Sequence, residues 1–337
     1  MTEGISIVIC CYNSVERLGK TLSHLQRQIF SKPINWEVIL VDNASTDNTA
    51  SFAYEFWNQN PVTNLTIVKE QKPGQMHARK KGYENVQYSL ISFVDDDNWV
   101  EANWVEKINA LFSANKEISV CGGLTEAVID SQKPYWFDLI ATVFAVGRQG
   151  DGSGFINQPE HSLWGAGLSI RTKVCAKLYD GDFAYKLMGR SGKNLVAGED
   201  SEICLYLKLK GYRLWYQEDI TLKHEIPAFR LSNEYAKKIM YSMGRSEVVL
   251  AMYRNALNPN YKIYSSWVLE TLSQIKYLPA LLLKRILSSK KKRFLAKMNY
   301  IFRVGYIYGT IITRAKRKYT LKSIRDIKND NPASSTF

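Results

Sequence analysis

The sequence predicts an α/β protein built on a doubly wound, mostly parallel sheet with helices on both faces, followed by a basic helical extension at the C-terminus. Short apolar, β-branched runs recur along the first 125 residues, and a stretch with apolar residues at helical spacing follows most of them. Strands that alternate with helices in this way form parallel sheets. Ligands bind such sheets beyond the carboxyl ends of the strands. The polar residues that end these runs are therefore expected to share one rim.

The elements follow one another in a regular order. "ISIVICCYN" is the first strand, after which Asn13 and Glu16 resemble a capping box that opens a helix. "WEVILVDNASTDNT" predicts a strand that ends at Asp42, then a helix. "LTIVKEQKPGQMHARKKGYENV" predicts a third strand, a Pro-Gly break and a third helix. "YSLISFVDDDNWV" is the fourth strand, a helix begins at about Asn103, and "EISVCGG" predicts a fifth strand.

The middle of the chain is less regular. "VGRQGDGSG" carries four glycines but follows no clear strand, so it is either a mobile loop or, as the less favoured alternative, a phosphate cradle. Further on, "AGEDSEICLYLKLKGYRLWYQ" predicts a helix that starts at Asp200 or Ser201 and stops at Gly211.

Composition excludes several classes of protein. With 337 residues, of which 45% are apolar, the chain can bury a sizeable core, and nothing suggests disorder. The five cysteines are scattered and include no CxxC pair, which indicates reduced thiols and argues against a zinc site. The first residues, "MTEG", lack a basic segment and lead into a strand, so we expect no signal peptide.

The net charge of +13 is confined to the tail, because residues 276–337 hold sixteen Lys or Arg against two Asp. The apolar residues of this region lie near a 3.6-residue period, but no run reaches the roughly 18 to 20 residues needed to span a bilayer. This pattern favours amphipathic helices on an anionic membrane surface. The alternative is a helical subdomain packed on the core with a solvated basic face. No nucleic-acid-binding motif accompanies the basic residues, so nucleic acid is not an expected partner.

Three consecutive carboxylates, Asp95, Asp96 and Asp97, end the fourth predicted strand. Adjacent carboxylates repel one another unless a cation or hydrogen-bond donors compensate them. Alternation along a strand end places Asp95 and Asp97 on one side and Asp96 on the other. Two hard oxygen ligands on one side suit Mg²⁺ or Mn²⁺ together with substrate phosphates, so this cluster predicts a divalent metal site. A solvated acidic turn is the alternative.

Six segments, taken in order, carry a resemblance to a known family: "VICCYN", "EVILVDNASTDNT", "PGQMHARKKGYENV", "FVDDDNWV", "GAGLSIR" and "AGEDSEICLYLKLKGYRLWY". Residues 5 to about 225 resemble a family 2 glycosyltransferase of the GT-A fold. The resemblance implies a GT-A domain over residues 1–230, with a nucleotide-sugar half at about 1–125 and an acceptor half at about 126–230. Residues 231–337 then form a basic amphipathic helical region that the family motifs do not cover.

The resemblance also implies roles for particular residues. Asp42 is similar to the acid that binds the nucleotide base, and Arg79 would lie near the diphosphate. The nucleotide-sugar-binding residues would be Cys11, Tyr12, Asn13, Asp42, Ser45, Arg79, Asp95 and Asp96. Asp97 would be the direct ligand of Mg²⁺ or Mn²⁺, with Asp95 and His224 as further metal ligands, although a lone histidine is as often structural. Trp164 and Gly165 would form the acceptor and sugar pocket, where Tyr135 and Trp136 are further aromatic candidates.

Glycosyl transfer needs a base to take the proton of the acceptor hydroxyl. By resemblance Asp200 is the catalytic base, and Glu199 positions the acceptor or substitutes for it. The alternative is that both carboxylates cap a helix and complement its dipole. A single base opposite the leaving group implies inversion at the anomeric carbon. The sequence has no QxxRW motif of processive relatives, which implies addition of one sugar per encounter.

These patterns together predict a metal-dependent, inverting glycosyltransferase. It would move a sugar from a nucleotide-sugar, by preference UDP-linked, to a hydroxyl of a glycan or lipid-linked acceptor in surface polysaccharide synthesis. We expect it in the cytoplasm, at the inner face of the cell membrane. Two alternatives stay open: a sugar nucleotidyltransferase, which "CCYNSVERLGK" disfavours because it lacks a Gly-rich segment, and a non-catalytic glycan-binding or scaffold protein.

Overall fold

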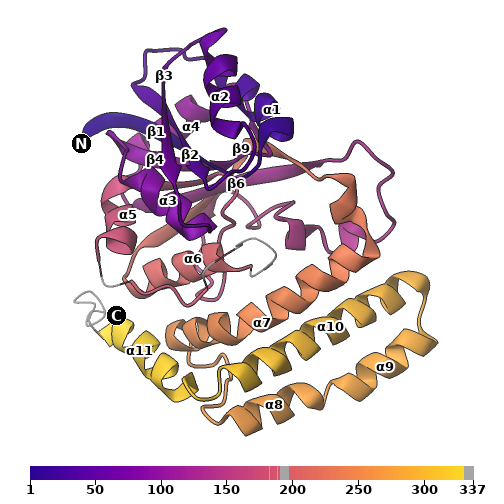
Figure 1. Ribbon diagram of the computed structural model, residues 1–337. Coiled ribbons are helices and arrows are strands. Elements are labelled where there is room, and N and C mark those ends of the chain that lie inside the picture. The colour runs from indigo at the N-terminus through magenta and orange to yellow at the C-terminus, as the bar shows by residue number, and fades with distance from the viewer. Residues whose placement is uncertain (182, 188, 190–196, 330–337) are drawn as a thin grey trace.

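A mixed sheet of nine described strands organises the fold, which confirms the predicted α/β class with its mostly parallel sheet (Figure 1). The computed structural model describes residues 1–181, 183–187, 189 and 197–329. The strands run in the order β3-β2-β1-β4-β8-β6-β9-β5, and β7 pairs with β9. The whole parallel half of the sheet comes from the first 95 residues.

The parallel half follows the predicted alternation of strands and helices. Its strands are β1 (Thr2–Cys11), β2 (Trp36–Asn43), β3 (Asn64–Glu70) and β4 (Tyr88–Asp95), and its helices are α1 (Val15–Gln26), α2 (Thr49–Asn58) and α3 (Gln75–Tyr83). All eight residues of β2 are buried, as expected for a strand covered on both faces. The capping-box prediction was wrong. Helix α1 begins at Val15, while the side-chain carbonyl of Asn13 accepts from the backbone N–H of Thr46 at 2.8 Å.

The second half of the sheet is mixed. It contains β5 (Asn98–Val100), β6 (Ile118–Val128), β7 (Gly154–Phe155), β8 (Leu168–Arg171) and β9 (Arg213–Glu225), with helices α4 (Trp104–Ala114), α5 (Thr172–Tyr179) and α6 (Glu199–Leu209) and the short 3₁₀ turns η1 (Phe137–Leu139) and η2 (Ala141–Phe144). The predicted fifth strand exists as β6, but antiparallel β8 lies between it and β4. Strand β9 pairs with β5 and so brings the end of β9 beside the carboxylate cluster.

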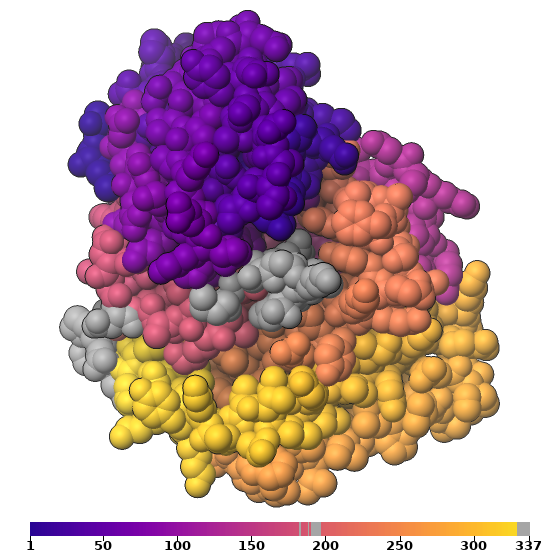
Figure 2. Space-filling model, viewed as in Figure 1, coloured from indigo at the N-terminus to yellow at the C-terminus, as the bar shows by residue number. Residues whose placement is uncertain are grey.

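The C-terminal region is a layer of helices under the sheet. After η3 (Ala228–Leu231) come α7 (Asn233–Leu257), α8 (Trp267–Ile275), α9 (Leu278–Leu287), α10 (Lys290–Ile312) and α11 (Arg317–Asn329). In Figure 1, α7 lies next to the sheet half, α10 lies beside α7, and α8 and α9 are outermost. The space-filling view shows the sheet half and these helices as one continuous body (Figure 2).

Helices α7 and α10 approach each other closely because glycines line their contact. A Cβ added to Gly244 would lie 2.0 Å from the carbonyl oxygen of Phe302, and one added to Gly305 would lie 2.2 Å from that of Tyr241. Gly309 meets Arg245 in the same way, at 2.8 Å. The Gly305 and Gly309 pair in the sequence therefore serves helix packing on the body of the protein.

The core divides over the two faces of the sheet. One cluster joins β1 and β2 to α1, α2 and α4, and a second joins the opposite face to α5, α6 and α7. A third cluster joins η1 and η2 to α7 and α10. Buried residues of α7, α10 and α11 all belong to the second cluster. For these three helices, the structure agrees with the alternative in which the C-terminal region packs on the core. Among the residues that the structure describes, no helix is both long enough and apolar enough to cross a membrane.

Candidate active site

A cavity of about 720 Å³ opens at the carboxyl ends of β1, β2 and β4, where the sheet predicts a ligand. This volume lies within the roughly 300–1,000 Å³ that ligand sites occupy. The strand ends provide one wall, helix α6 and the loop before β8 provide another, and helix α7 closes the side toward the C-terminal region.

Residues at the ends of β1 and β2 hold the rim of this cavity. Cys11 and Tyr12 line it, together with Asn43 and Ala44 of the β2 end. Two residues of the rim have left-handed backbone conformations, Asn13 with φ 50° and Ala44 with φ 58°, which is uncommon for residues other than glycine.

Three of the predicted nucleotide contacts form a hydrogen-bonded group behind this rim. The backbone N–H of Asn13 donates to Ser45 Oγ at 3.1 Å, and the N–H of Ser45 donates to Asp42 Oδ1 at 3.2 Å. None of the three is among the described residues that line the cavity. Their predicted contact with a nucleotide stays a prediction, and their present role is to fix the turn.

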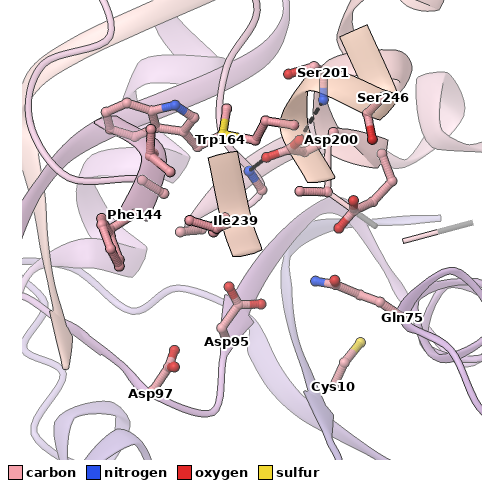
Figure 3. Close-up of a pocket in the computed structure, with 18 of the residues that line it drawn as sticks. Cys10, Gln75, Asp95, Asp97, Phe144, Trp164, Asp200, Ser201, Ile239 and Ser246 are labelled. Carbon is pink, nitrogen blue, oxygen red and sulfur yellow. Dashed lines mark hydrogen bonds between the residues drawn. The ribbon is translucent and has the colours of Figure 1, made fainter. Parts of the chain in front are cut away.

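The three consecutive aspartates all line the cavity but have different partners. Asp96 is paired with Arg17 at 2.7 Å and accepts from the hydroxyl of Ser14. Asp95 and Asp97 project into the cavity from the same side, as the alternation predicts (Figure 3). Asp96 therefore anchors the β4 end to helix α1, while Asp95 and Asp97 face the cavity.

Asp97 belongs to a buried polar group that also contains His224 and Arg230. Its Oδ1 lies 3.5 Å from His224 Nε2, and its Oδ2 lies 3.3 Å from Arg230 Nη1. The other ring nitrogen of His224 lies 3.0 Å from the carbonyl oxygen of Phe144. Since a carbonyl can only accept, Nδ1 carries a hydrogen, and in the neutral ring the lone pair of Nε2 faces the Asp97 carboxylate. A proton or a cation is needed between those two atoms.

Burial and neighbouring charges push the pKa values of the three aspartates apart. Burial raises the pKa of Asp95, although Arg79 opposes the shift, and it also raises the pKa of Asp96 against the effect of Arg17. Burial acts on Asp97 in the same direction, but His224 and Arg230 more than offset it and hold its pKa well below the usual range. Asp97 is therefore the carboxylate that stays ionised most firmly.

Arg79 of α3 is a buried cation on the wall of the cavity, 1% exposed. Its Nη2 donates to the carbonyl of Gly165 at 3.5 Å, while its Nε and Nη1 have no hydrogen-bond partner within the described part of the chain. In the amide orientation that its neighbours require, Gln75 donates to Glu199 Oε1 at 2.9 Å and accepts from Arg79 Nη2 at 3.2 Å. A buried guanidinium with spare donors is suited to bind an anion.

Asp200 lies across the cavity from Asp95 and Asp97 (Figure 3). It is half-buried at the start of α6, where Gly198 supports the turn with φ 103°. Its Oδ2 accepts from the backbone N–H of Gly165 at 2.8 Å and its Oδ1 from that of Ser201 at 2.7 Å. The N-cap of α6 is Gly198 and the helix has no side-chain cap hydrogen bond, so Asp200 lies in the first turn, where its carboxylate faces the cavity.

The predicted sugar pocket is present in part. Trp164 and Gly165 line the cavity, and the backbone N–H of Trp164 donates to Gln149 of the glycine-rich loop at 2.6 Å. A Cβ at Gly165 would lie 2.4 Å from Arg79 Nη2, so a side chain at this position would displace the Arg79 guanidinium. Trp136 instead stacks on Phe294 in the core, with ring centroids 5.3 Å apart, and does not line the cavity in the described structure.

Sequence reasoning missed the wall that the C-terminal region supplies. Helix α7 and the segment before it, together with one residue of α10, line the cavity with Arg230, Tyr235, Ile239, Met243, Ser246, Glu247, Leu250, Arg254 and Phe302. The predicted domain boundary at residue 230 falls within this wall. The division of the chain into two domains stays a prediction. No motif marks these residues in the sequence, because a long helix with small and apolar residues on one face reads as ordinary core.

The side-chain oxygen and nitrogen atoms of the cavity can be compared with the ligands that Mg²⁺ and Mn²⁺ require. Within the described residues, no three His, Cys, Asp or Glu side chains are grouped to hold a metal ion. Both ions nevertheless need only one or two protein ligands when substrate phosphates supply the rest. Asp97 and His224 offer two ligand atoms 3.5 Å apart, with the histidine oriented through its Nδ1 as metal-binding histidines are. The residues therefore fit a substrate-assisted divalent metal.

The fold and the position of the site define the class of protein, an α/β protein of GT-A architecture with an acidic ligand site at the strand ends. The crystal structure of S. aureus TarS 1-349 in complex with UDP-GlcNAc is similar, with a TM-score of 0.50, 16% identity and coverage of 93% of this chain and 92% of that one. At this identity the likeness shows the fold alone.

The family follows from the sequence comparison. The model of glycosyl transferase family 2 matches residues 6–178, and the chain belongs to this family. "Glycosyltransferase GlyG" of Streptococcus pneumoniae serotype 4 is 32% identical over 108 residues, which are 32% of this chain and 35% of the relative. "Poly-beta-1,6-N-acetyl-D-glucosamine synthase" of Staphylococcus aureus is 27% identical over 99 residues, 29% of this chain and 23% of the relative. The chain thus aligns with about a third or less of these relatives.

Proposed function

We propose that the protein is a metal-dependent, inverting glycosyltransferase that moves one sugar from a UDP-sugar to a hydroxyl of a glycan or lipid-linked acceptor. The observation that carries this proposal is the opposition of carboxylates across a single cavity. Asp95 and Asp97 project from the strand ends, and Asp200 faces them from α6 (Figure 3). The leaving group and the attacking hydroxyl need two such separate groups, one on each side of the sugar.

The donor would bind along the strand ends. Cys11 and Tyr12 would contact the nucleoside, with Asn13, Asp42 and Ser45 holding the base side of the rim. Arg79 has two unsatisfied donor nitrogens in the described structure, which suits it to the diphosphate. A uridine nucleotide is proposed because the similar TarS structure is in complex with UDP-GlcNAc.

Asp97 and His224, with Asp95 beside them, would hold Mg²⁺ or Mn²⁺. When bound, the ion supplies Lewis-acid stabilisation of the charge that develops on the departing diphosphate. Arg230 lies 3.3 Å from Asp97 and compensates its charge within the group.

Asp200 would take the proton of the acceptor hydroxyl. Its two hydrogen bonds, from Gly165 and Ser201, hold the carboxylate in the cavity wall. As the acceptor oxygen attacks the anomeric carbon, the bond from that carbon to the diphosphate oxygen breaks on the opposite face, and the configuration inverts. Glu199, held by Gln75, would position the acceptor, and Trp164 would contact a sugar ring.

The acceptor side of the cavity indicates the kind of acceptor. Apolar side chains of α7 and α10, including Ile239, Met243 and Phe302, stand there beside the polar Ser246 and Glu247. Such a mixed wall suits a sugar that is joined to a larger, partly apolar molecule. We therefore propose an acceptor at the cytoplasmic face of the cell membrane in surface polysaccharide synthesis, for which the similarity to a polysaccharide synthase is further support.

Calorimetric titration of UDP and GDP tests the donor site. We expect UDP to bind the wild-type protein more tightly with Mn²⁺ than without it, and this gain to disappear in Asp97→Ala. Asp326→Ala, an exposed acid on α11, is the matched control and should bind as wild type does. If neither nucleotide binds under any of these conditions, the transferase proposal fails and a non-catalytic glycan-binding or scaffold protein becomes the better account.

A further inference from the structure

Helices α8 and α9 form an arm whose apolar side chains are not covered by the other residues that the structure describes. None of the ten residues of α9, all of them described, is buried. Ile286 is 71% exposed and Leu287 is 74% exposed, and Leu282 and Leu283 are exposed beside them. In Figure 1 this arm is the outermost layer, on the side of α10 away from the sheet.

Six of the exposed apolar residues of the arm lie at helical spacing. They are Val268, Leu272 and Ile275 on α8, and Leu282, Leu283 and Ile286 on α9. Residues three and four apart lie on one face of a helix, so each helix presents an apolar stripe to solvent. Single exposed apolar residues are normal on protein surfaces, but a contiguous stripe marks an interaction site. We call these six residues the apolar ridge.

The charges around the ridge are of one sign. From Lys262 to Arg325 the sequence holds sixteen Lys or Arg and a single acid, Glu270. Glu270 is 2% exposed and is paired with the buried Arg317 at 2.9 Å, so it does not reach the surface. The arm and the helices beside it therefore present apolar and cationic side chains.

A second cavity, of about 380 Å³, lies at the end of the ridge, where α7 begins, α9 ends and α10 begins. Its basic side chains are Lys237, Arg285, Lys290, Arg293 and Lys297, and we call it the basic pocket. Within the cavity wall, one acid, Glu234, is paired with Lys237 at 3.4 Å. Lys290 Nζ lies 4.1 Å from the ring centroid of Tyr135, which also lines the pocket.

We propose that the apolar ridge and the basic pocket together dock the protein on an anionic membrane surface. The ridge would enter the boundary between head groups and acyl chains, and the basic pocket would hold the phosphate of an anionic lipid. Basic amphipathic helices bind such surfaces through buried apolar area and through attraction to the anionic lipids. A second copy of the chain is a poorer occupant, because it would bring two cationic surfaces together.

Vesicle co-sedimentation of the full chain tests this proposal. We expect binding to phosphatidylcholine vesicles that contain phosphatidylglycerol, weaker binding to phosphatidylcholine alone, and loss of binding as salt is raised. Point variants are preferable to deletion of residues 276–337, because that deletion removes α10 from its contact with α7. Leu283→Asp/Ile286→Asp tests the ridge, and Lys290→Gln/Arg293→Gln tests the pocket.

The pocket variant should weaken partition by about ten- to a hundredfold, since each basic residue near an anionic surface contributes roughly 1 kcal/mol. The ridge variant should also weaken partition, because it removes apolar area that would be buried and adds two like charges. Lys32→Gln/Lys116→Gln removes two exposed lysines from the sheet half and should bind as wild type does. Equal binding to both kinds of vesicle, or no loss in the ridge variant, would overturn the proposal. So would a wild-type dimer in sedimentation velocity that the ridge variant converts to a monomer, which would make this face an interface between copies.

Discussion

The strand-end rim and the C-terminal arm both concentrate like charges, but the protein surrounds them in opposite ways. On the rim, Asp96 and Asp97 are buried, and arginines lie 2.7 and 3.3 Å from them. On the arm, Lys276 and Lys284 are exposed to water, and the acid of this stretch, Glu270, is buried.

This difference decides how much each cluster says about function. Burying a carboxylate costs free energy unless partners compensate it, so a buried acidic cluster at the mouth of a cavity points to a ligand of opposite charge. Exposed cations cost little and by themselves indicate little. The arm becomes informative only because its cations stand beside an apolar ridge that nothing in the described structure covers.

The largest effect is expected at Asp200. Replacement with Asn keeps an oxygen that can accept from the N–H of Gly165 but removes the base, so kcat should fall by about 10²- to 10⁴-fold. UDP affinity should stay unchanged, because the strand-end residues would bind the nucleotide. Transfer assays with a UDP-sugar, and calorimetry with UDP, measure the two quantities.

Asp138→Asn, at an exposed acid far along the chain, is the control for this experiment. A fall in kcat of less than tenfold would show that Asp200 only holds the backbone of Gly165 and Ser201 in place. A parallel loss of UDP affinity would show that the substitution disturbs the donor side as well.

The next effect concerns the buried ion pair of the helical layer. Glu270 accepts from Arg317, from the hydroxyl of Tyr306 and from the backbone N–H of Tyr264. Glu270→Gln leaves the Arg317 guanidinium buried without its counter-charge, and we expect unfolding free energy to fall by about 3–5 kcal/mol in urea titration. Glu270→Leu/Arg317→Met should recover most of that loss.

The exposed pair of Lys133 and Asp138 provides the comparison for this stability measurement. Breaking it with Lys133→Met should change the unfolding free energy by less than about 1 kcal/mol. If Glu270→Gln and Lys133→Met lower the unfolding free energy equally, then the burial of Glu270 does not increase the cost of losing its ion pair. The contrast drawn above between buried and exposed charges would then be wrong.

A third effect is a pH dependence of stability that Glu202 causes. Burial raises its pKa from 4.5 to about 7, although backbone N–H groups of Leu187 and Lys186 and the hydroxyl of Tyr253 oppose the shift. Because the folded state holds this proton more tightly, its contribution is complete below about pH 4.5 and is lost as the pH rises to about 7. The loss amounts to about 3 kcal/mol.

Urea titrations of wild type and Glu202→Gln between pH 4.5 and pH 8 check this expectation. The unfolding free energy of wild type, relative to that of Glu202→Gln, should fall as the pH rises from 4.5 to about 7 and should then level off. A constant difference would mean that Glu202 is ionised throughout, held by its hydrogen-bond donors.

Much of the sheet half could be predicted because its signals are local. A buried strand reads as a continuous apolar run, and the aspartates at the end of β4 follow directly from that run. The β8 insertion could not be predicted, since the four residues of β8 carry no sign of their antiparallel partners. Likewise, the amide of Asn13 resembles a helix cap in sequence, while its partner, Thr46, lies in a different loop.

The predicted site residues that stand in motifs are brought together by the structure, whereas cavity residues that come from packing were missed; the roles of the predicted residues stay predictions. Asp97 and His224 were expected to share a metal, and the structure places them 3.5 Å apart. Arg230 and the α7 wall were not expected, because only the tertiary contact of α7 with the strand ends brings them there. The tail was interpreted from its charge and its apolar period, which describe α9 but miss the close packing of α10.

The smallest effect tests that packing. A Cβ at Gly305 would lie 2.2 Å from the carbonyl oxygen of Tyr241, so Gly305→Ala should destabilise the protein by about 1–3 kcal/mol, although alanine favours helices intrinsically. Gly152→Ala, where a Cβ meets nothing within 4 Å, should be neutral. Thermal unfolding of both variants measures the difference.

The same variant separates the two faces of the helical layer. Gly305 faces α7, away from the apolar ridge, so the folded Gly305→Ala protein should bind anionic vesicles as wild type does, whereas Leu283→Asp/Ile286→Asp should lose vesicle binding and keep its unfolding temperature. If instead Gly305→Ala reduces vesicle binding at a temperature where it is folded, then the arm depends on the α7–α10 contact for its shape. The inner packing and the outer docking surface would then be one structural unit.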